Sequence, residues 1–230
     1  MAASLAAATM AGATVATAVT ASATMAPAGT AATAPAAIAP SAPASPTAPA
    51  VTAWRADASR GTLTFRAMQA GAEFEGRFTR FVAQLQFVPG DRPTGRFDVA
   101  IATASVDSAE RERDDLLRSP EFFDSTRVPE ARYLATSFAR IDDGTYEARG
   151  RLTLRGVARD VPLRFTWSGA PAAPQLTGSA VLRRLDFGVG QGEWRDTAWV
   201  GDEVRIAFAL RPVPAPSAPQ AASPTLPEPR

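Results

Sequence analysis

The side chains that can carry chemistry in this sequence are almost all arginines and carboxylates. The 230 residues include 24 basic and 23 acidic side chains; every basic one is Arg, and there is neither His nor Cys. Ser–His and Cys–His dyads, a Lys Schiff base and a P-loop lysine are therefore excluded. Zinc sites built on Cys and His, and haem attached through Cys, are excluded as well. Carboxylates remain as the only familiar acid–base groups.

The two pairs of adjacent aspartates do not fit a catalytic or metal site. Glycoside hydrolysis uses two carboxylates on either side of a cleft, but Asp114 and Asp115 are neighbours on a predicted helix and point apart. Asp142 and Asp143 precede Gly144, which is typical of a hairpin turn, and no further oxygen ligands for calcium are spaced around them. We therefore expect no enzyme, no metal and no cofactor, and keep a carboxylate-dependent enzyme as the weakest alternative.

The aromatic residues mark out one folded domain. All twelve Phe, four Trp and two Tyr lie between Trp54 and Phe208, while 13 of the 20 prolines lie outside this stretch. Residues 54–211 are enough for a single core. Residues 27–53 are predicted to be an Ala/Pro-rich linker and residues 212–230 a Pro-rich disordered tail. The formal charge of +1 argues against a nucleic-acid partner, which needs a basic face.

Residues 1–26 are predicted to be a signal peptide. They are uncharged and free of proline, and small residues such as Ala21, Ser22 and Ala23 suit a cleavage site, although only the terminal amine supplies the usual positive charge. The alternative is a disordered low-complexity arm. Export predicts a periplasmic location, and the lack of Cys is compatible with that compartment.

Alternating hydrophobicity predicts antiparallel strands throughout the domain. Residues 96–103, 146–155, 161–167 and 204–210 each place apolar side chains on one face and mostly polar or small side chains on the other. In residues 72–88 the alternation slips by one position, which predicts a bulge that bends the strand. The pattern predicts an all-β fold, either a sandwich or an antiparallel eight-stranded barrel, with one short helix. The interior of such a barrel is either packed or holds one slim ligand.

The helix is predicted over residues 109–118. Asp107 or Ser108 is expected to cap it, with Glu110 completing a capping box, and Pro120 follows its end. Apolar side chains at and after its last turn are predicted to cover one end of the barrel. They are Leu116, Leu117, Phe122 and Phe123.

A series of short motifs, taken in order and spacing, resembles the polyisoprenoid-binding YceI-like family of exported barrels. The resemblance covers residues 54–211. The motifs are residues 74–78 (Phe-Glu-Gly-Arg-Phe) with Phe87, 105–108 (Ser-Val-Asp-Ser), 113–114 and 117–124 (Arg-Asp, then Leu-Arg-Ser-Pro-Glu-Phe-Phe-Asp), 129–131 (Pro-Glu-Ala), 150–157 (Gly-Arg-Leu-Thr-Leu-Arg-Gly-Val), 184–190 (Arg-Leu-Asp-Phe-Gly-Val-Gly) and 200–204 (Val-Gly-Asp-Glu-Val).

The resemblance implies a lipocalin-like barrel in the periplasm, with no catalytic step, whose lumen holds the tail of an isoprenoid lipid such as ubiquinone or polyprenyl phosphate. Many relatives carry His where this chain has Arg60, Leu116 and Gln69, so contacts made by those histidines are not expected in this chain. Residues 191–194 with Trp199 resemble a subgroup associated with b-type membrane cytochromes. This implies such a cytochrome as a partner, and the protein is expected to be a monomer or dimer.

The candidate ligand-binding residues are the apolar side chains of the predicted inward faces. They are Phe65, Phe74, Phe78, Phe97, Val99, Ile101, Phe138, Leu152, Phe165, Trp167, Phe187 and Phe208. At the mouth, polar side chains are candidates to meet a lipid headgroup: Gln69, Arg113, Asp114 and Arg184.

For any single apolar candidate, ordinary core packing is the favoured explanation, and only the set as a whole favours a ligand in the lumen. For the arginine and aspartate candidates, an Arg–Asp ion pair that orients the helix and the barrel is favoured. The alternative function is an envelope interaction or scaffold module that has a packed barrel and no lipid ligand. Its contacts would come from the Pro-rich flanks and the loop between Trp194 and Trp199.

Overall fold

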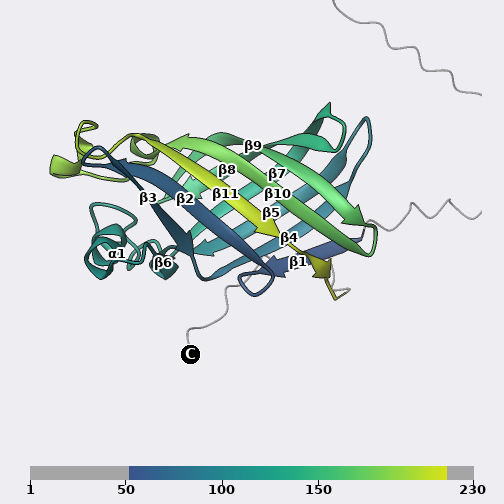
Figure 1. The fold of residues 1–230 in the computed structure, drawn as a ribbon, viewed down its shortest axis with the longest axis horizontal. Coiled ribbons are helices and arrows are strands. Elements are labelled where there is room, and N and C mark those ends of the chain that lie inside the picture. The colour runs from purple at the N-terminus through teal and green to yellow at the C-terminus, as the bar shows by residue number, and fades with distance from the viewer. Residues whose placement is uncertain (1–51, 217–230) are drawn as a thin grey trace, which may run out of the picture. The chain divides into compact units, whose positions relative to one another are not determined.

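The described part of the chain is one antiparallel sheet curled around an apolar interior (Figure 1). The computed structural model describes residues 52–216, which contain twelve strands, one α-helix and three short 3-10 helices. The expectations for residues 1–26, for nearly all of the linker at 27–53 and for the tail beyond residue 216 lie outside the described residues.

Strands make up most of the described chain, and the helical segments lie between them. The strands are β1 Ala53–Asp57, β2 Gly61–Gln69, β3 Ala72–Phe78, β4 Phe81–Val88, β5 Thr94–Ala102, β6 Val106–Asp107, β7 Glu130–Asp142, β8 Thr145–Leu154, β9 Val157–Ala170, β10 Ala173–Arg183, β11 Glu203–Leu210 and β12 Val213–Pro214. The helices are η1 Thr103–Ser105, α1 Arg111–Arg118, η2 Arg184–Phe187 and η3 Gly192–Arg195.

The strands lie in the order β12-β1-β4-β5-β7-β8-β9-β10-β11-β2-β3-β6, and every neighbouring pair is antiparallel. The all-β antiparallel class with one α-helix is confirmed, but the count of eight strands is not. β6 and β12 have two residues each, too few to leave an alternating pattern in the sequence. β12 also lies in the segment predicted to be a disordered tail, yet it pairs with β1.

The slip in alternation within residues 72–88 marks a corner between two strands, not a bulge. β3 pairs with β2 and β6, whereas β4 pairs with β1 and β5. At the corner the Thr79 N–H donates to the Ser105 carbonyl at 3.0 Å, and the Ala102 N–H donates to the Arg80 carbonyl at 3.0 Å. Because the chain changes neighbours at this corner, inward-facing side chains change parity between β3 and β4.

Two of the predicted turns are confirmed as hairpin loops. Asp143 and Gly144 join β7 to β8, and Gly144 has φ +72°. Arg155 and Gly156 join β8 to β9 with φ values of 53° and 77°. The left-handed conformation is the one that a tight two-residue hairpin needs.

The capping box predicted for α1 is wrong. Glu110 is the N-cap residue and makes no side-chain capping bond. Ala109 takes a left-handed conformation (φ 59°), which separates Ser108 from the helix. Ser108 donates its backbone N–H and its hydroxyl to Asp114 at 2.8 and 2.7 Å. Asp114 therefore fastens the helix to the preceding chain, where the sequence pattern predicted an N-terminal cap.

Six aromatic rings pack together in the interior near the end of β4, the start of β5, the end of β7, the start of β8 and the end of β9. These strand ends lie opposite the end of the sheet that carries α1 (Figure 1). The ring of Phe87 contacts the five others, with centroid distances from 5.0 to 5.9 Å. We call this group the aromatic plug. Its members are Phe87, Phe97, Phe138, Tyr146, Phe165 and Trp167.

Candidate functional site

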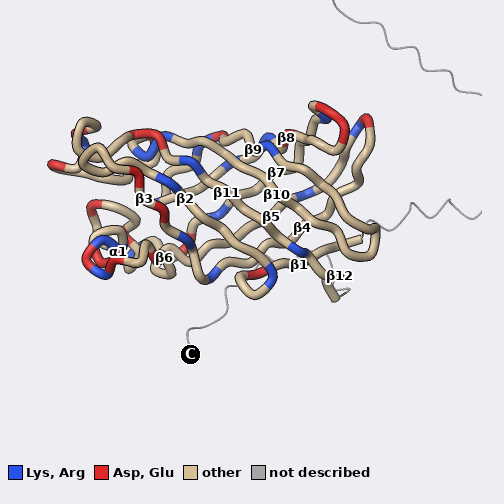
Figure 2. The backbone as a smooth tube through the Cα atoms, viewed as in Figure 1, with Lys and Arg blue, Asp and Glu red and all other residues tan. Residues whose placement is uncertain are grey.

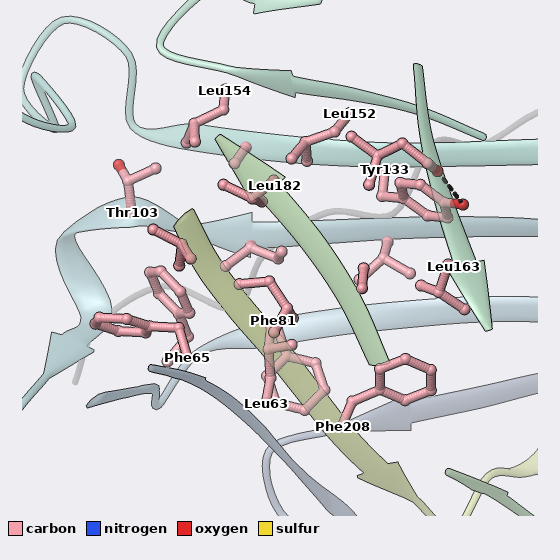
Figure 3. Close-up of a pocket in the computed structure, with 18 of the residues that line it drawn as sticks. Leu63, Phe65, Phe81, Thr103, Tyr133, Leu152, Leu154, Leu163, Leu182 and Phe208 are labelled. Carbon is pink, nitrogen blue, oxygen red and sulfur yellow. Dashed lines mark hydrogen bonds between the residues drawn. The ribbon is translucent and has the colours of Figure 1, made fainter. Parts of the chain in front are cut away.

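A cavity of about 180 Å³ lies inside the curled sheet, between the aromatic plug and α1. Figure 3 shows side chains from several strands, among them Leu63, Phe81, Leu182 and Phe208, pointing into this common space. Strands β2 to β5 and β7 to β11 all contribute to its wall, together with η1, α1 and the loop that follows α1. Charged residues lie along the strands and around α1 (Figure 2). Among the described residues, Arg184 is the one charged member of the cavity wall.

The polar side chains in the wall already bond to backbone carbonyls. The Thr103 hydroxyl donates to the Val128 carbonyl at 3.0 Å. The Tyr133 hydroxyl lies 3.1 Å from the carbonyl of Val161 (Figure 3), and burial, followed by the charge of Glu147, raises the pKa of this phenol. These groups offer a ligand little hydrogen bonding, so the cavity suits hydrocarbon.

The cavity volume sets the size of what fits without rearrangement. A comparable apolar cavity of about 150 Å³ stays dry and binds benzene or xenon. The volume of about 180 Å³ therefore matches roughly one five-carbon isoprene unit. A longer tail requires wall side chains to move or has to leave the cavity.

Eight of the twelve predicted apolar residues line the cavity. They are Phe65, Phe74, Phe78, Phe97, Val99, Ile101, Leu152 and Phe208. Several of them, such as Val99, Ile101 and Leu152, keep part of their surface accessible although they point inward. That residual exposure faces the cavity.

The other four predicted residues do not line it. Phe138, Phe165 and Trp167 belong to the aromatic plug, and Phe187 is buried in η2 with 1% of its surface exposed. Alternation along β9 identifies the correct face, because Val161 and Leu163 on the same face line the cavity. Alternation does not reveal at which positions along the strand large aromatic rings fill the interior and end the cavity.

Further wall residues were not among the predicted site residues. Val204, Ile206 and Leu210 on β11 belong to the same alternating stripe as Phe208, so the signal was present in the sequence. The remaining ones are Leu63, Ala67, Phe81, Leu85, Thr103, Leu117, Phe122, Phe123, Ala131, Tyr133, Leu154, Val161, Leu163, Leu176, Ala180, Leu182, Val189 and Val200.

Three of the four side chains predicted to cover one end of the interior do so at the α1 end of the cavity, whereas Leu116 does not line it. Leu117, Phe122 and Phe123 all line it. The ring of Phe123 packs on Phe78 at 5.9 Å, and the ring of Phe122 packs on Trp194 at 5.6 Å. We call residues 117–123 the lid segment.

Hydrogen bonds hold the lid segment to the rest of the fold. Arg155 donates to the Pro120 carbonyl at 2.6 Å. The backbone N–H groups of Gly190 and Gln191 both donate to the Glu121 carbonyl, at 2.8 and 2.9 Å. Opening the lid segment therefore requires breaking a small set of polar contacts that lie outside the cavity.

Two of the predicted headgroup residues lie together at the rim. The Arg113 Nε donates to Gln69 Oε1 at 3.2 Å, and the guanidinium lies 4.5 Å above the ring of Phe74, which lines the cavity. Arg113 also pairs with Glu110. The arrangement puts a cation and an amide next to an apolar wall, as a headgroup would require at the entrance.

The other two predicted headgroup residues are bound up internally. Asp114 accepts both hydrogen bonds from Ser108 described above and is buried. Arg184 is 3% exposed and donates to the carbonyls of Val189, Val200 and Gly201 at 2.7 to 3.0 Å. Burial lowers the pKa of its guanidinium, an effect that Asp202 opposes. Arg184 thus clamps two loops at the α1 end of the cavity.

The described residues, 52–216, offer neither a metal cluster nor a membrane-crossing helix. They contain no group of three or more His, Cys, Asp and Glu side chains that would hold a metal ion. No helix among them is long and apolar enough to cross a membrane.

Comparison with known proteins connects this architecture to one family. The family model described as the YceI-like domain matches residues 54–211. A UPF0312 protein of Shewanella denitrificans is 31% identical over 140 residues, which are 57% of this chain and 72% of the relative. A UPF0312 protein of Vibrio cholerae is 28% identical over 138 residues, or 57% of this chain and 73% of the relative.

Solved structures agree on the fold. The crystal structure of Burkholderia cenocepacia BcnA has a TM-score of 0.63 at 29% identity, covering 67% of this chain and 98% of its own. A domain from Saccharophagus degradans, described as a polyisoprenoid binding domain implicated in plant cell wall breakdown, has a TM-score of 0.55 at 14% identity. It covers 72% of this chain and 99% of its own, and at this identity the likeness shows the fold alone.

Proposed function

Because this chain belongs to the YceI-like domain family, we propose that it is a periplasmic binding protein that holds the tail of an isoprenoid lipid in the cavity for transport, storage or sequestration. A structural neighbour described as a polyisoprenoid binding domain supports lipid binding in general. The observation that carries the proposal for this chain is the apolar cavity of about 180 Å³, whose few polar side chains already bond to the backbone.

The physical basis is removal of hydrocarbon from water. Each buried CH₂ group contributes about 0.8 kcal/mol, so a branched five-carbon unit gains several kcal/mol on entering the cavity, before the costs of association. The rim pair of Arg113 and Gln69 is placed to meet a polar headgroup, and the lid segment lies across the α1 end. The proposal includes no catalytic step.

The finer parts of the proposal concern the lipid class and the partners. The tail belongs to ubiquinone or to a polyprenyl phosphate, both of which carry a headgroup suited to Arg113. A membrane b-type cytochrome is the proposed partner on the quinone side, and the protein acts as a monomer or dimer. Co-purification from membranes and the mass in solution test these two parts.

The main test is the lipid content of the protein itself. The full chain is expressed with export intact in a Gram-negative host and purified gently, and its organic extract is analysed by mass spectrometry. We expect a quinone or polyprenyl species at close to one molecule per protein. A folded protein that carries no lipid and takes up no added isoprenoid would instead favour the scaffold alternative, in which the exposed Trp199 makes contacts.

A pair of substitutions connects the lipid to the cavity. Ile101→Trp places a large ring in the cavity and is expected to lower the lipid content at least tenfold. Val181→Trp puts the same side chain on the outer surface, where Val181 is 55% exposed, and is expected to leave the lipid content unchanged. Equal lipid in both folded variants contradicts binding in this cavity.

A further inference from the structure

The two ends of the cavity are formed by different kinds of structure, a loop segment at one end and packed aromatic rings at the other. At the α1 end the cover is the lid segment, whose Pro120 and Glu121 carbonyls accept hydrogen bonds from the Arg155 side chain and from the backbone N–H groups of Gly190 and Gln191. At the other end the cavity meets the aromatic plug, whose member in the cavity wall is Phe97, a residue 2% exposed. Of the six rings in the aromatic plug, Phe97 alone lines the cavity, with the others behind it.

The ring of Phe97 is fixed by its neighbours. Its centroid lies 4.9 Å from that of Phe138, 5.1 Å from that of Phe165 and 5.9 Å from that of Phe87. Phe87 and Phe165 are themselves 5% and 2% exposed. A ring packed on several sides by other rings has no space into which to rotate, so an entering tail cannot push it aside as it can a single aliphatic side chain.

We infer that Phe97 is the floor of the cavity and determines how many isoprene units of a bound tail are buried. This rests on the proposed function and adds to it a direction and a length preference. The free end of the tail meets Phe97, and the tail runs toward the α1 end, where the lid segment and the rim pair lie. Units beyond those that fit between floor and lid segment leave the cavity and add little to affinity.

A floor at Phe97 predicts a break in the dependence of affinity on chain length, meaning a chain length beyond which affinity stops rising. Affinity for a series of simple prenols is expected to rise with each added isoprene unit and then to level off. The position of the break depends on the distance from the floor to the rim. Replacing Phe97 by Leu removes three carbon atoms from the floor, fewer than the five of an isoprene unit, so the break is expected to move by one unit at most.

The experiment uses the full chain, stripped of lipid, and calorimetric titration with prenols of one to four isoprene units: 3-methylbut-2-en-1-ol, geraniol, farnesol and geranylgeraniol. Phe97→Leu deepens the cavity and is expected to move the break to a longer prenol. Phe97→Trp fills it and is expected to move the break to a shorter one. General destabilisation would change both variants in the same direction, so opposite shifts identify a floor.

A matched control and a folding check complete the test. Phe187→Leu makes the same exchange at a residue that is equally buried but does not line the cavity, and it is expected to leave the break in place. Thermal unfolding identifies any variant that does not fold. If one Phe97 variant does not fold, the break of the other is compared with those of wild type and Phe187→Leu. If wild type and variants show the same break, the floor is wrong while the proposed function stands. If wild type binds no prenol, the proposed function fails and this inference with it.

Discussion

The two halves of the interior are lined by the same alternating strands, yet one is filled and the other is hollow. In the half that holds the aromatic plug, five rings pack with centroids within 6 Å of that of Phe87. In the α1 half, mostly aliphatic side chains surround a cavity of about 180 Å³. The difference shows that alternation decides which side chains point inward, whereas their volume decides whether a space is left between them.

The two halves are also stabilised by different interactions. The half with the aromatic plug is stabilised by its ring packing, which buries large apolar areas. The α1 half relies more on hydrogen bonds that involve buried charged side chains: Arg184 donates to three backbone carbonyls, and Asp114 accepts from Ser108. A hollow region cannot be stabilised by filling, so polar contacts around its edge maintain its shape.

The largest expected effect comes from breaking the filled half. Phe87→Ala removes the ring that contacts all five others and is expected to reduce the free energy of unfolding by about 3–5 kcal/mol. Phe74→Ala makes the same change in the hollow half, where the ring is only partly buried, and is expected to reduce the free energy by about half as much. Urea unfolding measures both. Equal losses would mean that the two halves are packed alike.

The next prediction concerns the hydrogen bonds that Arg184 makes at the edge of the hollow half. Arg184→Met keeps an unbranched apolar stem but leaves the carbonyls of Val189, Val200 and Gly201 without their donor. The expected loss is about 3 kcal/mol, because each buried acceptor left unsatisfied costs roughly 1–3 kcal/mol and some will find water. The exposed Arg183→Met is the matched control and is expected to change the unfolding free energy by under about 0.5 kcal/mol.

A third prediction concerns access to the hollow half. Phe123→Ala removes a ring of the lid segment that lines the cavity and packs on Phe78. Bound prenol is expected to dissociate about tenfold faster, because less apolar contact has to be broken on opening. Stopped-flow displacement measures the rate. Leu116→Ala, on α1 but outside the cavity wall, serves as control; equal rates in all three proteins would place the exit elsewhere.

The features that could be predicted from the sequence are those that depend on local patterns. Antiparallel strands, the single helix, the turns at Gly144 and Gly156 and the cover formed by Leu117, Phe122 and Phe123 all follow from local patterns. Those patterns report the face on which each side chain lies.

The remaining features depend on which residues from distant strands meet. Phe138, Phe165 and Trp167 point inward like the cavity residues, but they come together with Phe87 because of strand register. The short strands β6 and β12 exist only because the edges of the sheet offer partners. The sequence position of Asp114 makes it a reasonable headgroup candidate. In the structure, however, the left-handed conformation of Ala109 turns Ser108 toward Asp114, and the Ser108 hydroxyl donates to this carboxylate.

The smallest expected effect concerns the ion pairs on the outer face of β5, next to Phe97. Asp98 follows Phe97 on β5 and points to the opposite face, where it accepts hydrogen bonds from Arg132 on β7 at 2.8 Å and from Arg96 at 2.9 Å. Burial opposes ionisation of Asp98, but the hydrogen bonds and charges of Arg132 and Arg96 outweigh it, so the pKa of this carboxyl is lowered. The ion pairs therefore favour the folded state when Asp98 is charged.

The sign of the pH dependence follows from that shift. A carboxyl whose pKa is lower in the folded state contributes stability that is fully present above its unfolded pKa of about 3.9 and is lost as pH falls through the folded pKa. Asp98→Asn is expected to cost about 1 kcal/mol at pH 7 and to flatten the decline in stability below about pH 4. Urea unfolding at a series of pH values, with Asp160→Asn at an exposed ion pair as control, separates this contribution from that of other carboxylates. If the variant and wild type lose stability in parallel below about pH 4, the bond between β5 and β7 at Asp98 does not brace the floor.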